Sequence, residues 1–142
     1  MIRNFTMNDY DEVSTLWQRT PGVKLSSLDD SREGIEQFLR RNPTTNFVAM
    51  EAGRIVGVAL GGHDGRRGYL YHTCVEEGNR RRLIGRQLVE SVIEAMKREK
   101  ITKLALVCLA NNEKGNAFWN RIGWTKRIDL NYYAISINEN NI

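Results

Sequence analysis

Residues 71–86 read Tyr-His-Thr-Cys-Val-Glu-Glu-Gly-Asn-Arg-Arg-Arg-Leu-Ile-Gly-Arg, and the fold is decided within them. Up to Val75 the residues continue a short strand-like run that begins at Tyr69. Beyond the arginines, apolar residues recur every four positions, at Ile84, Leu88, Val92 and Met96. This spacing places them on one face of a helix. We therefore predict a strand over 69–75, a basic loop, and an amphipathic helix to about Lys100.

The part of the chain before this stretch predicts one strand, two helices and a meander of strands. A first strand at 2–6 is followed by a helix over about 9–19, with Thr6 or Asn8 as its cap. A second helix carries apolar residues at helical spacing, at Ile35, Phe38 and Leu39. Apolar runs then predict the strands of the meander, at 47–50, 55–60 and 69–75, with a glycine-rich loop over 61–65.

The part after the long helix predicts a strand, a short helix and two closing strands. The continuous apolar run 104–109 is typical of a buried central strand. A helix follows over 113–121 and ends at Gly123, and the closing strands are predicted at 124–128 and 130–137. The order β-α-α-β-β-β-α-β-α-β-β favours the α/β (α+β) class, with a mixed, mostly antiparallel sheet and helices on both faces.

The composition fits a single globular domain spanning residues 1–142. Charged residues make up 27% of the chain and hydrophobic residues 41%, and no apolar run approaches the about 20 residues of a membrane span. The first residues lack the apolar core of a signal peptide, so we expect a cytoplasmic protein. Cys74 and Cys108 are expected to be buried thiols, and no zinc-ligand spacing is present, so no metal is expected.

The net charge of +4 indicates an anionic partner, and the densest positive cluster lies at Arg80, Arg81, Arg82 and Arg86. The start of a helix offers backbone N–H groups and a partial positive charge to a phosphate. Gly85 would allow a close approach, and the arginines would add charge-assisted contacts. The same residues also fit a structural role, in which Gly85 permits tight helix–sheet packing and the arginines face water.

A resemblance to a known family favours the phosphate interpretation. Val75, followed five residues later by Arg80 and then by Arg-Arg-Leu-Ile-Gly, is similar to the acetyl-CoA motif of the GNAT superfamily of N-acetyltransferases. That motif has Arg or Gln, two residues, Gly, one residue, and Gly or Ala. Asn112 and the segment 118–124, Phe-Trp-Asn-Arg-Ile-Gly-Trp, resemble a second family motif. The order of elements resembles the GNAT fold along the whole chain, as in small single-domain bacterial members.

The resemblance implies that acetyl-CoA is the co-substrate. A bulge would splay the strand at 73–75 from that at 104–109, and the pantetheine arm would enter the gap beside Asn112 and Trp119. The implied cofactor-binding residues are Thr73, Cys74, Val75, Arg80, Arg81, Arg82, Leu83, Ile84, Gly85, Arg86, Asn112 and Trp119. Two positions depart from the motifs, because Leu83 stands where a glycine is usual and Trp119 where a tyrosine is usual.

Acetyl transfer to an amine places more demand on a base than on an acid. Neutralising an amine of pKa ~10.4 at pH 7 costs roughly 4.6 kcal/mol, against about 2 kcal/mol for ionising a thiol of pKa ~8.5. The candidate catalytic residues are His72 and Glu76, as bases, and Trp119 near the leaving group. His63 and Asp64 are further candidates for the base. Four tyrosines could supply an acid, namely Tyr69, Tyr71, Tyr132 and Tyr133.

The expected function is acetyl-CoA-dependent transfer of an acetyl group directly to a primary amine of a small molecule or a peptide. The alternative is a catalytically weak acetyl-CoA-binding sensor or partner module of the same fold. A nucleic acid partner is not expected, because the basic residues form one cluster without a recognition motif. A membrane partner is not expected, because no apolar run is long enough to span a membrane. An exposed end strand could also pair two subunits into a homodimer.

Overall fold

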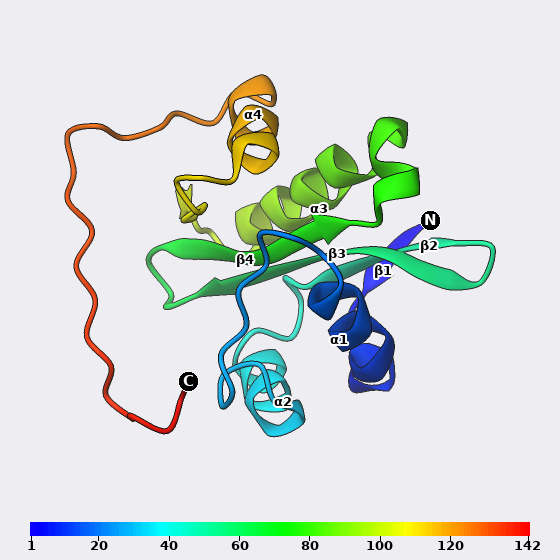
Figure 1. Cartoon of the computed structure of the whole chain (residues 1–142), viewed down its shortest axis with the longest axis horizontal. Coiled ribbons are helices and arrows are strands. Elements are labelled where there is room, and N and C mark those ends of the chain that lie inside the picture. The colour runs from blue at the N-terminus through cyan, green and yellow to red at the C-terminus, as the bar shows by residue number, and fades with distance from the viewer.

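The computed structural model describes residues 1–79 and 83–142, and gives 80–82 only as part of a short helix (Figure 1). Its elements are β1 (Ile2–Asn4), η1 (Met7–Asp9), α1 (Tyr10–Gln18), α2 (Arg32–Arg41), β2 (Phe47–Glu51), β3 (Arg54–His63), β4 (Gly68–Val75), η2 (Glu77–Arg82), α3 (Ile84–Arg98), β5 (Leu104–Ala105) and α4 (Glu113–Arg121). From β1 to α4, the strands and α-helices occur in the predicted order, and α4 has the predicted bounds.

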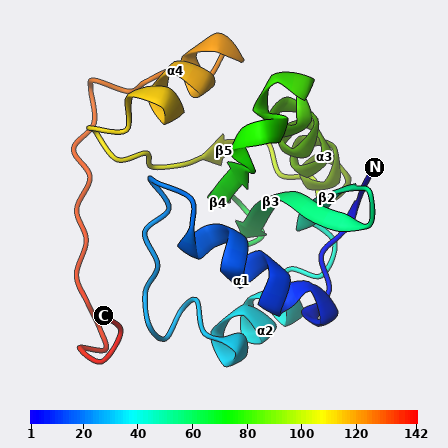
Figure 2. The same ribbon diagram turned by 45° about the vertical axis from the view of Figure 1, so that its right-hand side comes forward.

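The strands form one sheet in the order β1-β2-β3-β4-β5. Neighbours from β1 to β4 pair antiparallel, while β5 pairs parallel to β4, because α3 carries the chain back to the same end of the sheet. Helices α1 and α2 cover one face and α3 covers the other (Figures 1 and 2). The predicted mixed, mostly antiparallel sheet with helices on both faces is confirmed.

Each face of the sheet has its own apolar core. Leu88, Val92 and Met96 are buried on the inner face of α3, as the four-residue spacing predicts. Leu16 of α1 and Ile35 of α2 belong to the second core, on the opposite face. In the part of the chain that the structure describes, no helix is long and apolar enough to cross a membrane.

Capping residues set where the first two helices begin. Thr6 precedes η1, and its backbone N–H donates to Asp9 Oδ2 at 2.9 Å. Helix α2 begins after Ser31, whose Oγ accepts a hydrogen bond from the Gly34 N–H at 3.0 Å. Thr6 thus precedes the 3-10 turn η1, whereas the N-cap of α1 is Asp9, so neither Thr6 nor Asn8 holds the position predicted for the cap of the first helix.

Strand β3 is longer than predicted, because it runs through His63 and takes in the first part of the predicted glycine-rich loop. A Cβ at Gly61 would lie 2.7 Å from the Thr45 carbonyl oxygen, and one at Gly62 would lie 2.8 Å from the Phe38 ring. These glycines therefore permit close packing on a continuous strand, and the turn begins only after His63.

The strand predicted over 104–109 is formed only at its start. β5 pairs with β4 at Gly68 and Tyr69, and then the two strands part. Residues 106–109 continue the direction of β5 without a strand neighbour among the described residues. Apolar composition alone does not make a strand, because the backbone groups also need a partner.

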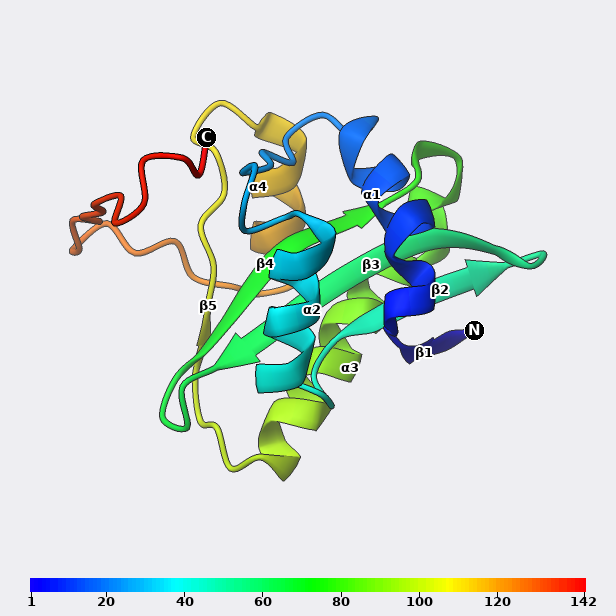
Figure 3. The same ribbon diagram turned by 90° about the horizontal axis from the view of Figure 1, so that it is seen from below.

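The two closing strands predicted at 124–128 and 130–137 are not formed. Residues 125–137 instead run as an extended segment that leaves α4 and passes outside the body of the molecule, drawn in orange and red in Figures 1 and 3. Because β5 is short, it offers too few backbone hydrogen-bonding groups for this segment to pair with. The physical reason for the wrong prediction is therefore the same as for β5, namely a missing partner strand.

The C-terminal residues return to the connection between α1 and α2. The Ser27 N–H donates to the Ile142 carbonyl oxygen at 2.7 Å, and Ser27 Oγ donates to the Asn140 carbonyl oxygen at 2.8 Å. Asn141 Oδ1 accepts from the Leu28 N–H at 2.9 Å and from the Asp29 N–H at 3.0 Å. The extended segment is thus fixed at both ends.

Candidate active site

A bulge in β4 gives the site its shape. Val58 of β3 is opposite Cys74 and Leu60 is opposite Tyr71, so β4 has one residue more than β3 between these pairs. His72 lies in this bulge with φ of +47°. The extra residue interrupts the alternation of faces. Tyr71 and His72 therefore point to the same side, with ring centroids 6.4 Å apart.

A cleft of about 1360 Å³ lies where β4 and β5 part. Tyr69 and Tyr71 line it from β4, Leu106 and Cys108 from the segment after β5, and Trp119 from α4. The resemblance to the GNAT fold implies such a splay beside a bulged strand. The structure contains both features.

The start of α3 follows the short helix η2, which is formed where a basic loop was predicted. Leu83 precedes the helix with φ of 61° and ψ of 15°, and its side chain cannot accept a hydrogen bond from the first turn. Ile84 and Gly85 are buried. Arg86 is exposed on the helix surface, where its Nε lies 3.2 Å from Glu90 Oε1. The side chains of Arg80, Arg81 and Arg82 lie outside the described residues, so their predicted pyrophosphate contacts stay predictions.

The motif glycine also has a packing role. A Cβ at Gly85 would lie 3.2 Å from the Phe118 ring of α4 and 3.6 Å from Val75 of β4. The absence of a side chain at Gly85 makes room for Phe118, and it would also leave the first turn of α3 accessible to a phosphate. The structural and the phosphate interpretations of Gly85 are therefore compatible.

Trp119 lines the cleft from α4, whereas Asn112, at the start of the same helix, is not among its lining residues. Asn112 caps α4, because its Oδ1 accepts from the Gly115 N–H at 3.0 Å. A Cβ on Gly22, in the α1–α2 connection, would lie 2.6 Å from Asn112 Nδ2. Trp119 packs against Trp124 at a centroid distance of 5.0 Å, with the rings tilted by 55°. The contact of Asn112 with Gly22 brings the start of α4 against the α1–α2 connection.

The two predicted bases differ sharply in their surroundings. Glu76 forms ion pairs with Arg19 and Arg54, each with a nitrogen–oxygen distance of 2.9 Å. These contacts lower the pKa of the Glu76 carboxyl group, and the hydrogen bond from Arg54 is the main cause. A carboxylate with a lowered pKa is a weak proton acceptor at neutral pH. Glu76 is therefore suited to fixing the end of β4 rather than to catalysis.

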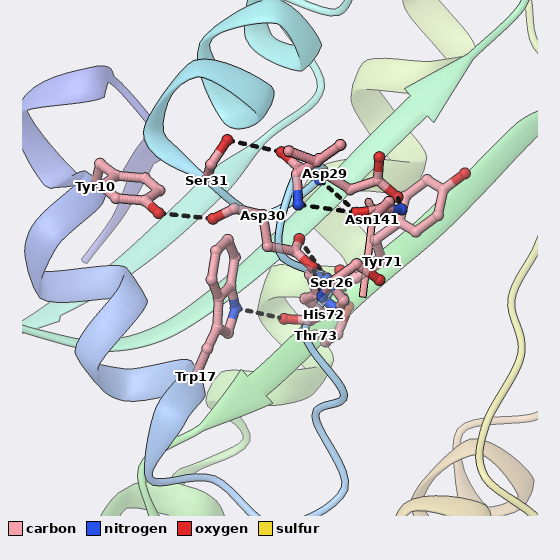
Figure 4. A network of polar contacts seen from close by, with 11 residues as sticks. Tyr10, Trp17, Ser26, Asp29, Asp30, Ser31, Tyr71, His72, Thr73 and Asn141 are labelled. Atoms are coloured by element: carbon pink, nitrogen blue, oxygen red, sulfur yellow. Dashed lines mark hydrogen bonds and ion pairs between the residues drawn. The ribbon is translucent and has the colours of Figure 1, made fainter. Parts of the chain in front are cut away.

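His72 is held by a residue that sequence reasoning missed. Its Nε2 lies 2.7 Å from Asp30 Oδ1, and its carbonyl oxygen accepts from Trp17 Nε1–H at 3.1 Å (Figure 4). Asp30 Oδ2 in turn accepts from the Ser26 N–H at 2.7 Å, and the Asp30 carbonyl oxygen accepts from the Tyr10 hydroxyl at 2.6 Å. The ring orientation of His72 is thus fixed by a nearly buried carboxylate.

Tyr69 and Tyr71 of the cleft are poor acids. Burial, with a smaller effect of Tyr132, raises the pKa of Tyr69 to about 12, and burial also raises the pKa of Tyr71. Transfer of a proton from Tyr69 to a thiolate of pKa ~8.5 would be uphill by roughly 5 kcal/mol. These hydroxyls are suited to hydrogen bonding with a ligand.

The remaining candidates have structural surroundings. His63 Nδ1 accepts from the Gly65 N–H at 3.0 Å, and Asp64 caps the turn by accepting from two backbone N–H groups, which lowers its pKa. Cys74 is buried as predicted, but Cys108 is only half-buried, and neither forms a disulfide. Burial raises the pKa of the Cys108 thiol, so it stays protonated and weakly nucleophilic at neutral pH.

The sequence profile described as the acetyltransferase (GNAT) family matches residues 10–124. The chain belongs to this family. A Sodalis glossinidius acetyltransferase is 33% identical over 112 residues, which are 79% of this chain and 78% of that protein. This GNAT acetyltransferase therefore uses acetyl-CoA as its co-substrate, and the cleft at the β4 bulge is the candidate place for the reaction.

Two solved structures share the fold of this GNAT acetyltransferase. Ard1 from Thermoplasma volcanium has a TM-score of 0.76 at 20% identity, over 87% of this chain and 80% of that chain. The acetyltransferase AAC(6')-Iy, in complex with the bisubstrate analogue CoA-S-monomethyl-acetylneamine, has a TM-score of 0.74 at 18% identity, over 96% of this chain and 97% of that chain.

Proposed function

We propose that this acetyltransferase moves an acetyl group directly from acetyl-CoA to a primary amine of a small molecule or a peptide. The observation that carries the proposal is the bulge of β4, which turns His72 toward the α1–α2 side beside the parted strands. His72, as a proton acceptor, would then lie next to the part of β4 that is suited to aligning a thioester. We further propose that residues 1–142 act as one catalytic domain and that it works in the cytoplasm.

The residues around the parted strands fit the co-substrate. Bound acetyl-CoA supplies the thioester from which the acetyl group is taken. We expect the backbone at 73–75 to align the pantetheine arm and the first turn of α3, at 83–86, to hold the pyrophosphate. Among the described residues, no side chain caps that turn, because Leu83 has no acceptor. Asn112 and Trp119 would contact the pantetheine arm from α4, and Arg80, Arg81 and Arg82 would add charge.

His72 is the proposed base. In the tautomer with its proton on Nε2, it donates to Asp30 and keeps Nδ1 as the proton acceptor. Asp30 acts as a positioning residue, since it fixes the tautomer and the ring. A backbone N–H at the bulge is suited to donate to the acetyl oxygen as negative charge develops there. Trp119 can shape the pocket, but an indole N–H is no useful acid.

The acceptor is proposed to enter on the side of Phe38 and Tyr71, whose rings lie 5.7 Å apart at the cleft. Trp17 is buried in the core and does not line the cleft. The Phe38 and Tyr71 rings meet edge to face, at an angle of 88°, and an aromatic corner beside a hydroxyl group suits an amine carried on an amphipathic small molecule or on a peptide end. AAC(6')-Iy, which shares the fold, was solved with an acetylneamine analogue.

The test is a thiol-release assay with acetyl-CoA and a panel of primary amines, with mass detection of the acetylated product. His72→Asn keeps a residue type that tolerates left-handed backbone. We expect it to lower turnover by roughly 10²–10⁴-fold, the usual effect of losing a general base, while coenzyme A binding is unchanged. Asp30→Asn should lower turnover by a smaller factor.

Tyr10→Phe is the matched control, because the Tyr10 hydroxyl contacts the Asp30 backbone and not its carboxylate. This variant should retain turnover. Wild-type turnover in His72→Asn would refute the assigned base. Tight coenzyme A binding without turnover of any amine would favour the sensor or partner module instead.

A further inference from the structure

The cleft at the parted strands continues past the β4 bulge to the turn between β3 and β4. Arg67, in this turn, and Lys103, just before β5, line its far end. The Gly68 N–H donates to the Lys103 carbonyl oxygen at 3.0 Å, which holds the two backbone segments together. Figure 3 shows the β3–β4 turn beside the chain that leads into β5. The proposed acetyl transfer uses no residue of this part of the cleft, which is here called the hairpin end (Arg67 and Lys103).

The charged residues that line the cleft are mostly basic. Among the described residues, four of them are basic, namely Arg67, Lys103, Lys126 and Arg127. Asp64 is the single acidic residue in the same set, and its Oδ1 accepts from the Arg66 and Arg67 N–H groups at 2.8 Å each, so its charge is bound within the turn. Arg127 is also paired, since its Nη2 lies 2.8 Å from Asp129 Oδ2. The cleft therefore carries an excess of positive charge.

The positive charge of the hairpin end is not neutralised within the described part of the chain, where Arg67, Lys103 and Lys126 form no ion pair. The hydrogen bond from Arg127 is the main cause that lowers the pKa of Asp129 to about 2, and Lys103 adds a smaller effect. That carboxylate is therefore already occupied by Arg127. A guanidinium beside an ammonium offers charge-assisted hydrogen bonds to the oxygens of a carboxylate or a phosphate. The hairpin end is thus suited to binding an anion.

The region of the β4 bulge has the opposite charge. Asp30 Oδ1 lies 2.7 Å from His72 Nε2, and Asp29 precedes it in the α1–α2 connection. Burial is the main cause that raises the pKa of Tyr71, and Tyr132 and the negative charge of Asp29 add to it. The amine of an acceptor is a cation at neutral pH before it loses its proton. The charges along the cleft therefore draw an amine to the bulge and an anion to the hairpin end.

We propose that the acceptor carries, besides its amine, a carboxylate or a phosphate group that binds Arg67 and Lys103 at the hairpin end. Gly68, which lies between the two basic residues and the bulge, is three residues from Tyr71. At 3.3 Å per residue of a strand, the anionic group lies roughly 10 Å from the amine. About three residues of extended peptide span this distance. The inference rests on the proposed function, because that function places the amine beside Tyr71 and His72.

The test compares three peptide amides that differ only in their third residue, which is glutamate, phosphoserine or glutamine. Calorimetry measures their binding to the protein loaded with coenzyme A, and thiol release measures their turnover with acetyl-CoA. We expect at least one acidic peptide to bind roughly tenfold more tightly than the glutamine peptide, because it gains hydrogen bonds to charged groups. Added salt should reduce this preference, since it screens exposed charges. The larger gain of the two acidic peptides identifies the anion.

Charge reversal assigns the preference to the hairpin end. Arg67→Glu should abolish the preference for the acidic peptide and should favour a fourth peptide amide with lysine as its third residue. Lys103→Glu should change the preference in the same direction. Arg66→Glu is the matched control, because Arg66 belongs to the same turn and is exposed but does not line the cleft. This variant has the same change in net charge as Arg67→Glu and should keep the wild-type preference.

Arg66, Arg67 and Lys103 are exposed, so the variants should keep the circular dichroism and the Tm of a folded protein. Equal binding of the acidic and neutral peptides by the wild type, or no binding of any of them, would overturn the proposal. A preference that both Arg67→Glu and Lys103→Glu leave unchanged would overturn it as well. Tighter binding of an acidic peptide that is never acetylated would support the anion site and contradict the proposed acetyl transfer, so the two failures are distinguishable.

Discussion

At the scale of single residues, left-handed backbone marks the two points where the chain would approach acetyl-CoA. Among the residues that the structure describes, the non-glycine residues with positive φ are Ala52, His72, Leu83 and Lys100. Of these, His72 lies in the β4 bulge and Leu83 precedes α3. This conformation costs roughly 1–2 kcal/mol for an L-residue and is concentrated at functional sites. Its occurrence at both positions supports the assigned cofactor side of the cleft.

The conformation of Leu83 accounts for its place in the motif. It adopts the backbone that glycine adopts most readily, and its side chain is 63% exposed. We expect Leu83→Gly to bind coenzyme A at least as tightly as the wild type, because the backbone makes the phosphate contact. The free energy of unfolding should change by less than about 1 kcal/mol, since relief of strain is offset by a more flexible unfolded chain. Calorimetry and urea unfolding measure the two quantities.

Leu83→Val is the matched control, because a β-branched residue strongly disfavours left-handed backbone. This variant should be less stable than the wild type and should bind coenzyme A more weakly. Clearly weaker binding by Leu83→Gly would show that the leucine side chain makes the contact, and the backbone assignment would then be wrong.

At the scale of elements, α4 is positioned by its own first turn and by α3. Asn112 caps the helix, and Phe118 packs over Gly85. A bulky residue at position 85 would therefore displace α4 as well as crowd the first turn of α3. For this reason, variants of Gly85 cannot separate packing from binding, whereas variants of Asn112 can.

Replacing Asn112 tests whether its side chain serves the helix, the cofactor or both. Asn112→Ala removes the cap and should lower the free energy of unfolding by about 1 kcal/mol in urea. Asn112→Ser keeps a capping oxygen and should remain close to wild-type stability. Because both variants lack the amide, both should bind coenzyme A more weakly in calorimetry. Unchanged binding in both would limit Asn112 to capping.

At the scale of the whole molecule, the C-terminus is linked to the proposed base. Asn141 Nδ2 donates to Asp29 Oδ2 at 2.8 Å, and the next residue, Asp30, holds His72 (Figure 4). The two ends of this connection are more than one hundred residues apart in sequence. The last residues therefore support the α1–α2 connection from outside.

Removing the Asn141–Asp29 hydrogen bond should make the position of His72 less fixed without changing the binding of coenzyme A. We expect Asn141→Ala to speed hydrogen–deuterium exchange over residues 26–30 and to lower turnover, because Asp30 holds His72 less firmly. Coenzyme A binding should not change. Glu139→Ala, two residues earlier, is the control and should resemble the wild type. Wild-type exchange over 26–30 in Asn141→Ala would show that the anchor has no such role.

How far the site could be predicted depended on the distance between its parts in the sequence. The strand, the basic stretch and the helix start over 69–86 are contiguous, so their pattern was readable, and so was that of the helix at 113–121. Asp30 lies 42 residues from His72, and nothing in its local pattern of cap residues indicates a pairing with a histidine. The same holds for Glu76, which Arg19 and Arg54 hold from other elements.

The sequence by itself determined the four α-helices and the order of strands and α-helices up to α4, because helical periodicity acts between near neighbours. Only the tertiary structure decided which apolar runs became strands and which of two bases had a suitable partner. Strand pairing and ion pairing depend on groups that the fold brings together. The closing segment at 125–137 is the clearest case, since its strand-like residues find no partner strand among the described residues.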